Sequence, residues 1–240
     1  MYSIETSKLT KKYKNKIAVD GINLQIKKGE LFALLGTNGA GKTTTIKMLS
    51  GIILPTSGNI KIENMNMDNE VFKIKEILNI SPQETAVAPN LTVKENLEFM
   101  AGVYQIKNKD NKINKLIKDF KLEEILNKKA KTLSGGWQRR LSIAISLIND
   151  PKVLFLDEPT LGLDVIARKE LWKIINELKG KMTIILTTHY MEEAESLSDR
   201  IGIMANGKLV DVGTSEELIK KTKTKNFEDA FVYIATGGKL

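Results

Sequence analysis

The sequence has 240 residues, of which 42% are hydrophobic and 28% are charged, proportions typical of a globular protein of one or two domains. No apolar run approaches the roughly 18–20 residues of a membrane-spanning helix, the first five residues lack signal-peptide features, and the absence of cysteine excludes disulfides and favours the cytoplasm. The net charge of +8 is spread along the chain rather than clustered, so we expect no nucleic-acid partner.

The first 28 residues alternate apolar and polar side chains, with Lys and Asn at the turns. Ile22, Leu24 and Ile26 repeat at the period of two that lines one face of a strand. The pattern predicts an N-terminal antiparallel β subdomain. Tyr13 lies within it, either as an ordinary strand aromatic or as a ring on which adenine stacks.

A glycine-rich segment follows, between an apolar run at 31–35 and a stretch of helical spacing at 45–49. Strand, loop and helix are the context in which G-x-x-x-x-G-K-[ST] binds phosphate, because backbone N–H groups point inward and the helix dipole attracts anions. Lys42 is predicted to reach the β- and γ-phosphates, and the Thr43 hydroxyl to bind Mg²⁺. We define the phosphate-binding loop as Gly36, Thr37, Asn38, Gly39, Ala40, Gly41, Lys42, Thr43 and Thr44. It predicts that the chain binds a nucleoside triphosphate.

The middle of the chain has a helical pattern, whereas its flanks alternate strands and helices. Short strands are predicted at 59–63 and 77–80, and Pro82 ends the second one just before Gln83. Thr92 and Glu95 have the spacing of a capping box, which predicts a helix through about residue 104, and 110–130 predict two short helices. We expect an α/β fold with a P-loop NTPase core, a mixed or parallel sheet and an inserted helical subdomain at about 84–150.

The segment Leu133-Ser134-Gly135-Gly136 precedes a helix predicted over 137–148. A Ser-Gly-Gly turn at a helix start offers backbone N–H groups and a positive dipole end to an anion. The alternative is a plain N-cap, for which serine is favoured.

Two apolar strands are predicted to end in polar side chains of catalytic type. The strand at 153–156 ends in Asp157 and Glu158, of which Asp157 is the expected magnesium partner and Glu158 is free to orient a water. Asp164 is predicted to cap a helix through residue 178. The strand at 182–186 leads to His189, the only histidine, either structural or placed where ligands bind in open α/β sheets.

The C-terminal part predicts a helix at 191–197 and a hairpin at Asn206-Gly207. A capping box at Thr214 and Glu217 and a short final helix follow. We expect a nucleotide-binding domain at 1–222 and a short tail at 223–240.

The order of these motifs resembles that of the ATP-binding cassette (ABC) ATPases, from about residue 2 to 222. The Leu-Ser-Gly-Gly segment before the acidic strand is the most specific part of the likeness. The resemblance implies that Tyr13 stacks on adenine and that Gln83 senses Mg²⁺ and the attacking water. It also implies that Glu158 is the catalytic base, that Asp164 contacts a dimer partner, and that His189 is a switch at the γ-phosphate.

The same resemblance implies that Ser134, Gly135 and Gly136 grip the γ-phosphate of ATP bound to an opposite subunit. Two cassettes, identical or paralogous, are then expected to close head to tail over two ATP molecules. The family usually has glutamine after Ser-Gly-Gly, whereas this chain has Trp137. That departure leaves the serine and glycine contacts intact and gives Trp137 itself no assigned role.

Residues 160–164, residues 188–195 and the short C-terminal tail give a softer resemblance to the cassettes of drug and lipid exporters. The implied function is an ATPase that uses ATP and Mg²⁺ to power an ABC transporter, with separate transmembrane permease subunits. The chain is then expected in the cytoplasm, held to the inner face of the cell membrane by the permease. The alternative is a soluble ABC-type ATPase acting on nucleic acid or ribosomes. Against it, the segment between Lys42 and Ser134 lacks the heptads of chromosome and repair relatives.

Overall fold

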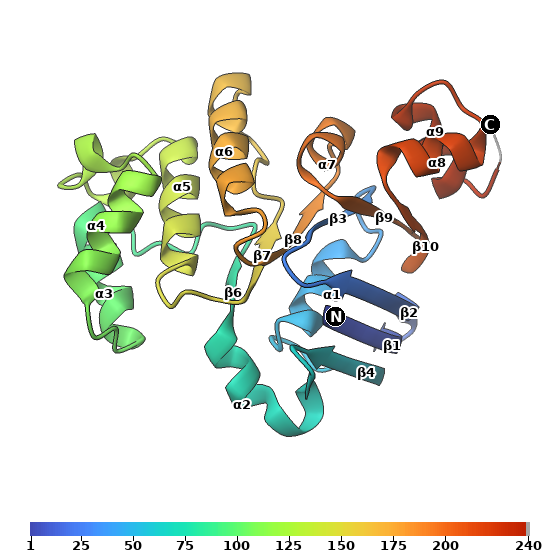
Figure 1. Cartoon of the computed structure of the whole chain (residues 1–240), viewed down its shortest axis with the longest axis horizontal. Coiled ribbons are helices and arrows are strands. Elements are labelled where there is room, and N and C mark those ends of the chain that lie inside the picture. Colours follow the sequence, from blue (N-terminus) through green and yellow to red (C-terminus); the bar gives the residue numbers. More distant parts are fainter. Residues whose placement is uncertain (239–240) are drawn as a thin grey trace.

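The computed structural model describes residues 1–238, and the strands within that range form two sheets (Figure 1). The smaller sheet is antiparallel and has the order β2-β1-β4-β5. Its strands are β1 (Tyr2–Tyr13), β2 (Lys16–Lys27), β4 (Ser57–Ile62) and β5 (Met65–Asn66). The predicted N-terminal antiparallel subdomain is therefore confirmed.

The larger sheet has the order β10-β9-β3-β8-β7-β6, and only β10 runs antiparallel to its neighbour. Its strands are β3 (Leu31–Gly36), β6 (Leu78–Ser81), β7 (Val153–Asp157), β8 (Thr183–Thr188), β9 (Arg200–Ala205) and β10 (Lys208–Gly213). Every residue of β3, β7 and β8 is buried, as expected for parallel strands covered on both faces. This arrangement confirms the α/β core with a mixed sheet.

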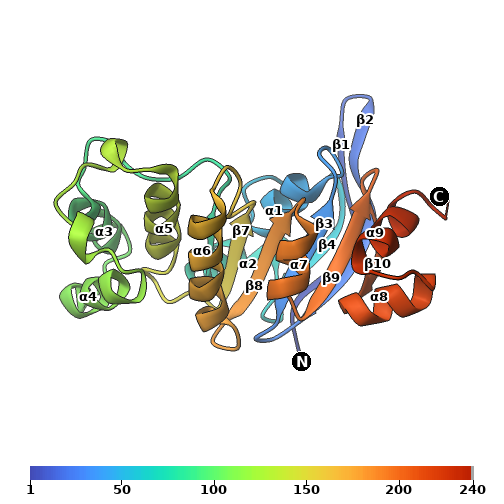
Figure 2. The same cartoon turned by 90° about the horizontal axis from the view of Figure 1, so that it is seen from above.

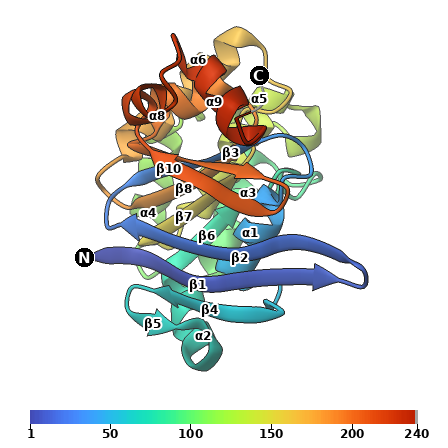
Figure 3. The same cartoon turned by 90° about the vertical axis from the view of Figure 1, so that its right-hand side faces the viewer.

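Helices cover both faces of the larger sheet. Helix α1 (Lys42–Leu49) lies between the two sheets, whereas α6 (Val165–Leu178), α7 (Met191–Leu197) and α9 (Phe227–Ala235) lie over the opposite face (Figures 2 and 3). Strand β3 serves both cores, since Leu31, Ala33 and Leu35 join one apolar cluster and Phe32 and Leu34 join the other. Each such fully buried large side chain contributes about 1.5–3 kcal/mol.

The helical segment lies at one end of the molecule (Figure 1). It comprises α3 (Val93–Val103), α4 (Lys109–Asp119) and α5 (Gly135–Ser146). The capping box of Thr92 and Glu95 is present at the start of α3. The prediction of two helices in 110–130 was half wrong, because only α4 is an α-helix and residues 123–125 make one 3₁₀ turn.

Two further helices differ from the sequence-based expectation. Helix α2 (Met67–Ile77) was not predicted, and the structure places it before β6. At the other end, α8 (Ser215–Thr222) is followed by α9, whose Phe227, Phe231 and Ile234 are buried in the main core. No helix within residues 1–238 has the length and apolar character needed to cross a bilayer.

Candidate nucleotide-binding site

The site forms where neighbouring parallel strands end at one edge of the larger sheet. Strands β3, β8 and β7 are adjacent, with Leu35 paired to Thr188 and Asp157 paired to Thr187. This register brings the start of the phosphate-binding loop, the acidic pair and His189 to the same edge, where ligands bind in open α/β sheets. The pocket there has a volume of about 500 Å³ and is lined by Lys16, Ala18, Asn38, Gly39, Ala40, Gly41, Lys42, Thr43, Thr44, Gln83, Glu158, Leu161 and His189.

The phosphate-binding loop needs its glycines for two different reasons. Gly41 has a φ of +104°, and a Cβ there would stand 2.6 Å from the carbonyl oxygen of Ala18. A Cβ on Gly36 would stand 2.4 Å from the carbonyl oxygen of Met204. Backbone atoms cannot yield at such distances, so both positions exclude any side chain.

Lys42 is the buried cation of the loop. Its Nζ donates to the carbonyl oxygen of Gly36 at 2.8 Å and to that of Thr37 at 3.2 Å. The same Nζ lies 3.3 Å from Glu158 Oε1, in an ion pair in which both side chains are buried. The ammonium group is thus held over the loop, where its hydrogen bonds can pass from these carbonyl oxygens to the oxygens of a bound phosphate.

Asp157 is held by two hydroxyl donors. Its Oδ1 accepts from Thr43 Oγ1 at 3.1 Å and from Thr187 Oγ1 at 2.6 Å. Within residues 1–238, no three Asp, Glu or His side chains gather into a self-contained metal site. Mg²⁺ in nucleotide sites usually takes one or two carboxylates and completes its shell with phosphates and water, so the Thr43–Asp157 pair fits that ion.

Glu158 follows the last residue of β7, and its carboxylate contacts Lys42 and His189 rather than the hydroxyl groups that hold Asp157. Its Oε2 is 2.5 Å from His189 Nδ1, and its N–H donates to the Oγ1 of Thr187 at 3.0 Å. The residue has a left-handed backbone with φ +49°, which turns the chain sharply out of β7. Lys42 and His189 therefore meet at one carboxylate.

Gln83 lines the pocket, and its backbone is held by Arg139, which was not predicted as a site residue. Arg139 of α5 donates to the carbonyl oxygen of Pro82 at 2.6 Å and to that of Gln83 at 2.5 Å. Burial lowers the pKa of Arg139, while the charges of Asp157 and Glu193 act in the opposite direction. Thr187 was also missed, although the register of adjacent strand ends is the signal that would find it.

Ser134 and Gly136 lie in a separate hollow of about 310 Å³, together with Trp137 and Asp164. Among the described residues, this hollow has no lining residue in common with the pocket of the phosphate-binding loop. Ser134 occupies the N-cap position of α5 but makes no side-chain cap bond, so the plain N-cap interpretation is not supported. Asp164 caps α6 as predicted, accepting from the N–H groups of Ile166 and Ala167 at 2.9 Å each.

Trp137 lines this hollow and packs against both the main apolar cluster and Arg140. The guanidinium of Arg140 lies 4.6 Å from the centre of the indole ring, a cation–π distance. Arg140 is itself paired with Glu170. The aromatic ring that stands where the resemblance leads one to expect glutamine is thus held by a paired arginine on its own helix.

Tyr13 is not brought to the pocket. It ends β1 with 47% of its surface exposed, and the ammonium of Lys11 lies 5.2 Å from its ring. The neighbouring strand contributes Lys16 and Ala18 to the pocket instead. Adenine stacking on Tyr13 stays a prediction.

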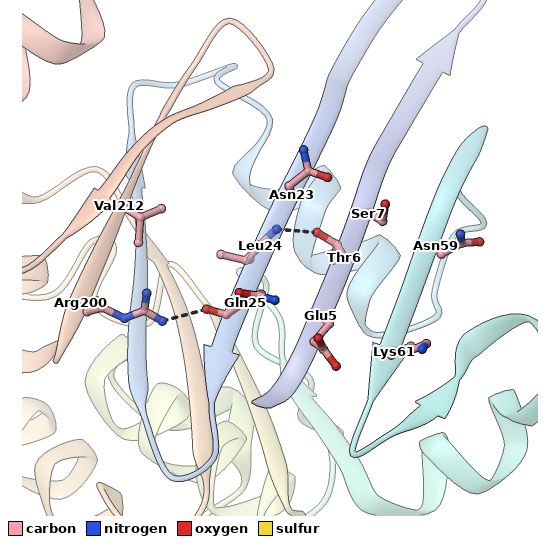
Figure 4. A pocket seen from close by; sticks show the side chains of 10 residues that line it. All are labelled: Glu5, Thr6, Ser7, Asn23, Leu24, Gln25, Asn59, Lys61, Arg200 and Val212. Carbon is pink, nitrogen blue, oxygen red and sulfur yellow. Dashed lines mark hydrogen bonds between the residues drawn. The ribbon is translucent and has the colours of Figure 1, made fainter. Parts of the chain in front are cut away.

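A larger hollow of about 640 Å³ lies on the outer face of the smaller sheet, between Lys61 and Arg200 (Figure 4). Arg200 is already paired with Glu30, at 2.6 Å from its Nε, and donates to the carbonyl oxygen of Gln25 at 2.8 Å. The phosphate-binding loop contributes no residue to its lining. We therefore do not include it in the nucleotide site.

Comparison with known proteins decides the family. The family described as "ABC transporter" matches residues 19–161. The chain belongs to this family. The ATP-binding cassette predicted from the order of motifs is thereby confirmed, with ATP as its nucleotide.

Two curated relatives of the cassette are named as transporter ATP-binding proteins. It is 41% identical over 228 residues to the probable multidrug ABC transporter ATP-binding protein YbhF of Escherichia coli (strain K12), a match that covers 94% of this chain and 39% of YbhF. It is 39% identical over 221 residues to the linearmycin resistance ATP-binding protein LnrL of Bacillus subtilis (strain 168), a match that covers 91% of this chain and 71% of LnrL. The chain thus spans about two fifths of YbhF and most of LnrL.

Solved cassettes have the same fold. An ATP-binding subunit of an ABC transporter superposes with a TM-score of 0.86 at 27% identity, covering 96% of this chain and 98% of that one. The cassette MJ0796, solved as a dimer in a post-hydrolysis state bound to ADP and Pi, superposes with a TM-score of 0.80 at 27% identity. That match covers 88% of this chain and 98% of MJ0796.

Proposed function

We propose that this cassette hydrolyses ATP to power an ABC transporter of the exporter type, through ATP-driven head-to-tail dimerisation. The observation that carries the proposal is the separation of the phosphate-binding loop from Ser134 and Gly136 on one chain. A γ-phosphate needs charge stabilisation on every side, and one chain offers donors on one side only. The second copy, or a paralogous cassette, supplies the other side.

The proposed roles of the loop residues follow from their contacts. Thr43 and Asp157 would hold Mg²⁺, with Gln83 lining the same pocket, and the ion would supply charge neutralisation at the phosphates. Lys42 binds the phosphates through its Nζ. Because that Nζ is paired with Glu158 in the structure, phosphate oxygens compete with the carboxylate for it.

Glu158 is the proposed general base. When Lys42 turns to the phosphates, Oε1 loses its cation and is free to accept a proton from an attacking water. Oε2 stays bonded to Nδ1 of His189, which fixes the orientation of the carboxylate. Because His189 is the proposed switch at the γ-phosphate, this hydrogen bond connects the orientation of the base to the presence of that phosphate.

The proposed partners are transmembrane permease subunits, with the helical subdomain at 84–150 and the Gln83 segment as the docking region. Buried Arg139 connects the two, since it extends from α5 to the backbone of Pro82 and Gln83. The cassette is then held at the inner face of the cell membrane. Co-purification of a membrane protein with the tagged native chain tests this part, and recovery of the chain only from the soluble fraction would oppose it.

Glu158→Gln tests the chemistry. We expect E158Q to bind ATP, to dimerise with it, and to hydrolyse it at least ~10²-fold more slowly, the usual size of a lost general base. His189→Ala is expected to lose activity while keeping its affinity for ATP. Near-normal turnover in E158Q would refute Glu158 as the base, and unchanged activity in H189A would leave His189 a structural residue.

A further inference from the structure

Glu193 is a fully buried carboxyl group to which the proposed mechanism gives no role. It lies in the first turn of α7 with 0% of its surface exposed. Its Oε1 accepts from Thr160 Oγ1 at 2.8 Å and from Trp172 Nε1 at 3.0 Å. Burial of a carboxyl group is unfavourable unless hydrogen bonds compensate for the lost water, and Thr160 and Trp172 supply two such bonds.

The two donors come from segments that carry the site. Thr160 lies in the loop that begins at Glu158 and ends at Asp164, and Trp172 lies on α6, which Asp164 caps. Glu193 itself lies four residues after His189. One carboxyl group therefore joins the loop of the proposed base, the helix behind that loop and the helix that follows the histidine.

The backbone conformation of the loop from Glu158 to Asp164 explains why the loop needs a fixed contact such as the bond to Glu193. The loop starts from the left-handed backbone of Glu158, an unfavourable conformation for a residue other than glycine that persists only where the surroundings enforce it. Inside the loop, the N–H of Leu161 donates to Glu158 O at 3.2 Å and that of Leu163 donates to Thr160 O at 3.1 Å. These bonds shape the turn, whereas the bond from Thr160 to Glu193 fixes it against α7.

We propose that Glu193 is a positioning residue for ATP hydrolysis, which holds the loop from Glu158 to Asp164 in place against the segment that carries His189. The inference rests on the proposed function, because it concerns the geometry of the same base. Without the anchor, Glu158 and His189 are no longer fixed at 2.5 Å. The phosphate-binding loop lies on another element, so ATP binding by one chain is unaffected.

Both hydrogen bonds require only an acceptor oxygen, not a negative charge. Burial raises the pKa of Glu193, and the charge of Glu158 raises it further, while the hydroxyls of Thr188 and Thr160 and the indole of Trp172 lower it. A glutamine offers an amide oxygen at the same position and can accept both bonds. The conservative variant therefore separates acceptor geometry from charge.

The test compares Glu193→Ala with Glu193→Gln in the purified 240-residue chain. Glu195→Ala is the matched control, because Glu195 lies exposed on the same helix. The readouts are kcat and KM for Mg-ATP, with circular dichroism to confirm folding. We expect E193A to lose about 10²-fold in kcat with KM changed less than about threefold, because misplacing a group by 1 Å has effects of this size. E193Q is expected to recover most of the loss, and E195A to match the wild type.

Thr160→Val keeps the inference testable if E193A fails to fold. It removes one of the two donors at constant shape, and a loss of about 1.4 kcal/mol in positioning predicts a roughly tenfold lower kcat. Wild-type kcat in folded E193A or in T160V would overturn the inference. So would a folded E193Q that is as slow as E193A.

The same assay distinguishes the two proposals. If the wild-type chain shows no turnover above that of E158Q, the proposed function fails and the role of Glu193 fails with it. If the wild type hydrolyses ATP and E193A does so equally well, only the positioning role of Glu193 is refuted.

Discussion

Replacing Thr187 by valine removes one hydroxyl from the centre of the site and keeps the shape of the side chain. Thr187 is 0% exposed and lies on β8, where its Oγ1 donates to Asp157 Oδ1 at 2.6 Å and accepts from the N–H of Glu158 at 3.0 Å. That N–H also reaches the backbone oxygen of Thr187 at 3.1 Å, so it stays paired in the variant. The change therefore removes one hydrogen bond to a charged group and creates no cavity.

A hydrogen bond to a charged group contributes about 1.5–3 kcal/mol. We expect Thr187→Val to lower the free energy of unfolding by about 2 kcal/mol and Tm by roughly 4–8 °C, at about 2–4 °C per kcal/mol for a chain of this size. Urea unfolding followed by circular dichroism, without nucleotide, measures the difference. T187V is also expected to bind Mg-ATP more weakly, because Asp157 keeps only the hydroxyl of Thr43 as a side-chain donor.

Thr183→Val is the matched control for this prediction. Thr183 lies on the same strand with 1% exposure, and its hydroxyl accepts from the neutral N–H of Gly29 at 3.0 Å. A neutral hydrogen bond contributes only about 1 kcal/mol, so T183V should cost less than T187V. If T187V were as stable as the wild type, or lost no more than T183V, the charge-assisted bond to Asp157 would not be the stabilising contact that the structure indicates.

Two further variants test the surroundings of the site. Arg139→Met keeps the apolar stem of the side chain but loses both hydrogen bonds to the backbone of Pro82 and Gln83. We expect kcat to fall by about tenfold or more while the helix content stays unchanged. An unchanged kcat would show that Gln83 is positioned without Arg139. Glu193→Gln tests the pH dependence of stability. Because the pKa of Glu193 is raised in the folded state, the protonated carboxyl group contributes fully to stability below about pH 4.5, and this contribution is lost as the pH rises through the folded-state pKa. Wild-type stability measured by urea unfolding should therefore fall relative to E193Q across that window, and parallel curves would contradict the raised pKa.

Features of the fold with local causes were predictable from the sequence. The capping boxes at Thr92 and Thr214 and the cap at Asp164 depend on residues two or three positions apart, so spacing alone reveals them. Helix α2 was missed because its pattern is weak. Only Met67 and Ile74 of that helix are buried, and Glu70 has a non-helical backbone.

The residues of the site likewise fall into those that short-range spacing predicts and those that it does not. The loop from Gly36 to Thr44 and the acidic pair are local motifs, and the structure brings them together at the edge of the sheet as expected. The contacts of Thr187 and Arg139 join residues tens of positions apart, and spacing gives no information about such pairs. Tyr13 does not line the pocket, so adenine stacking on its ring stays a prediction that the structure alone leaves untested.

Mixing two inactive chains tests the central claim most directly. Lys42→Ala disables the phosphate-binding loop, and Ser134→Arg blocks the Ser-Gly-Gly turn with a bulky cation. In a head-to-tail dimer of the two, one interface contains both defects and the other joins an intact loop to an intact turn. We predict that each variant alone hydrolyses almost no ATP and that the mixture regains turnover. If S134R alone hydrolysed ATP at the wild-type rate, or if the mixture were no more active than its parts, the site would not be shared between two chains.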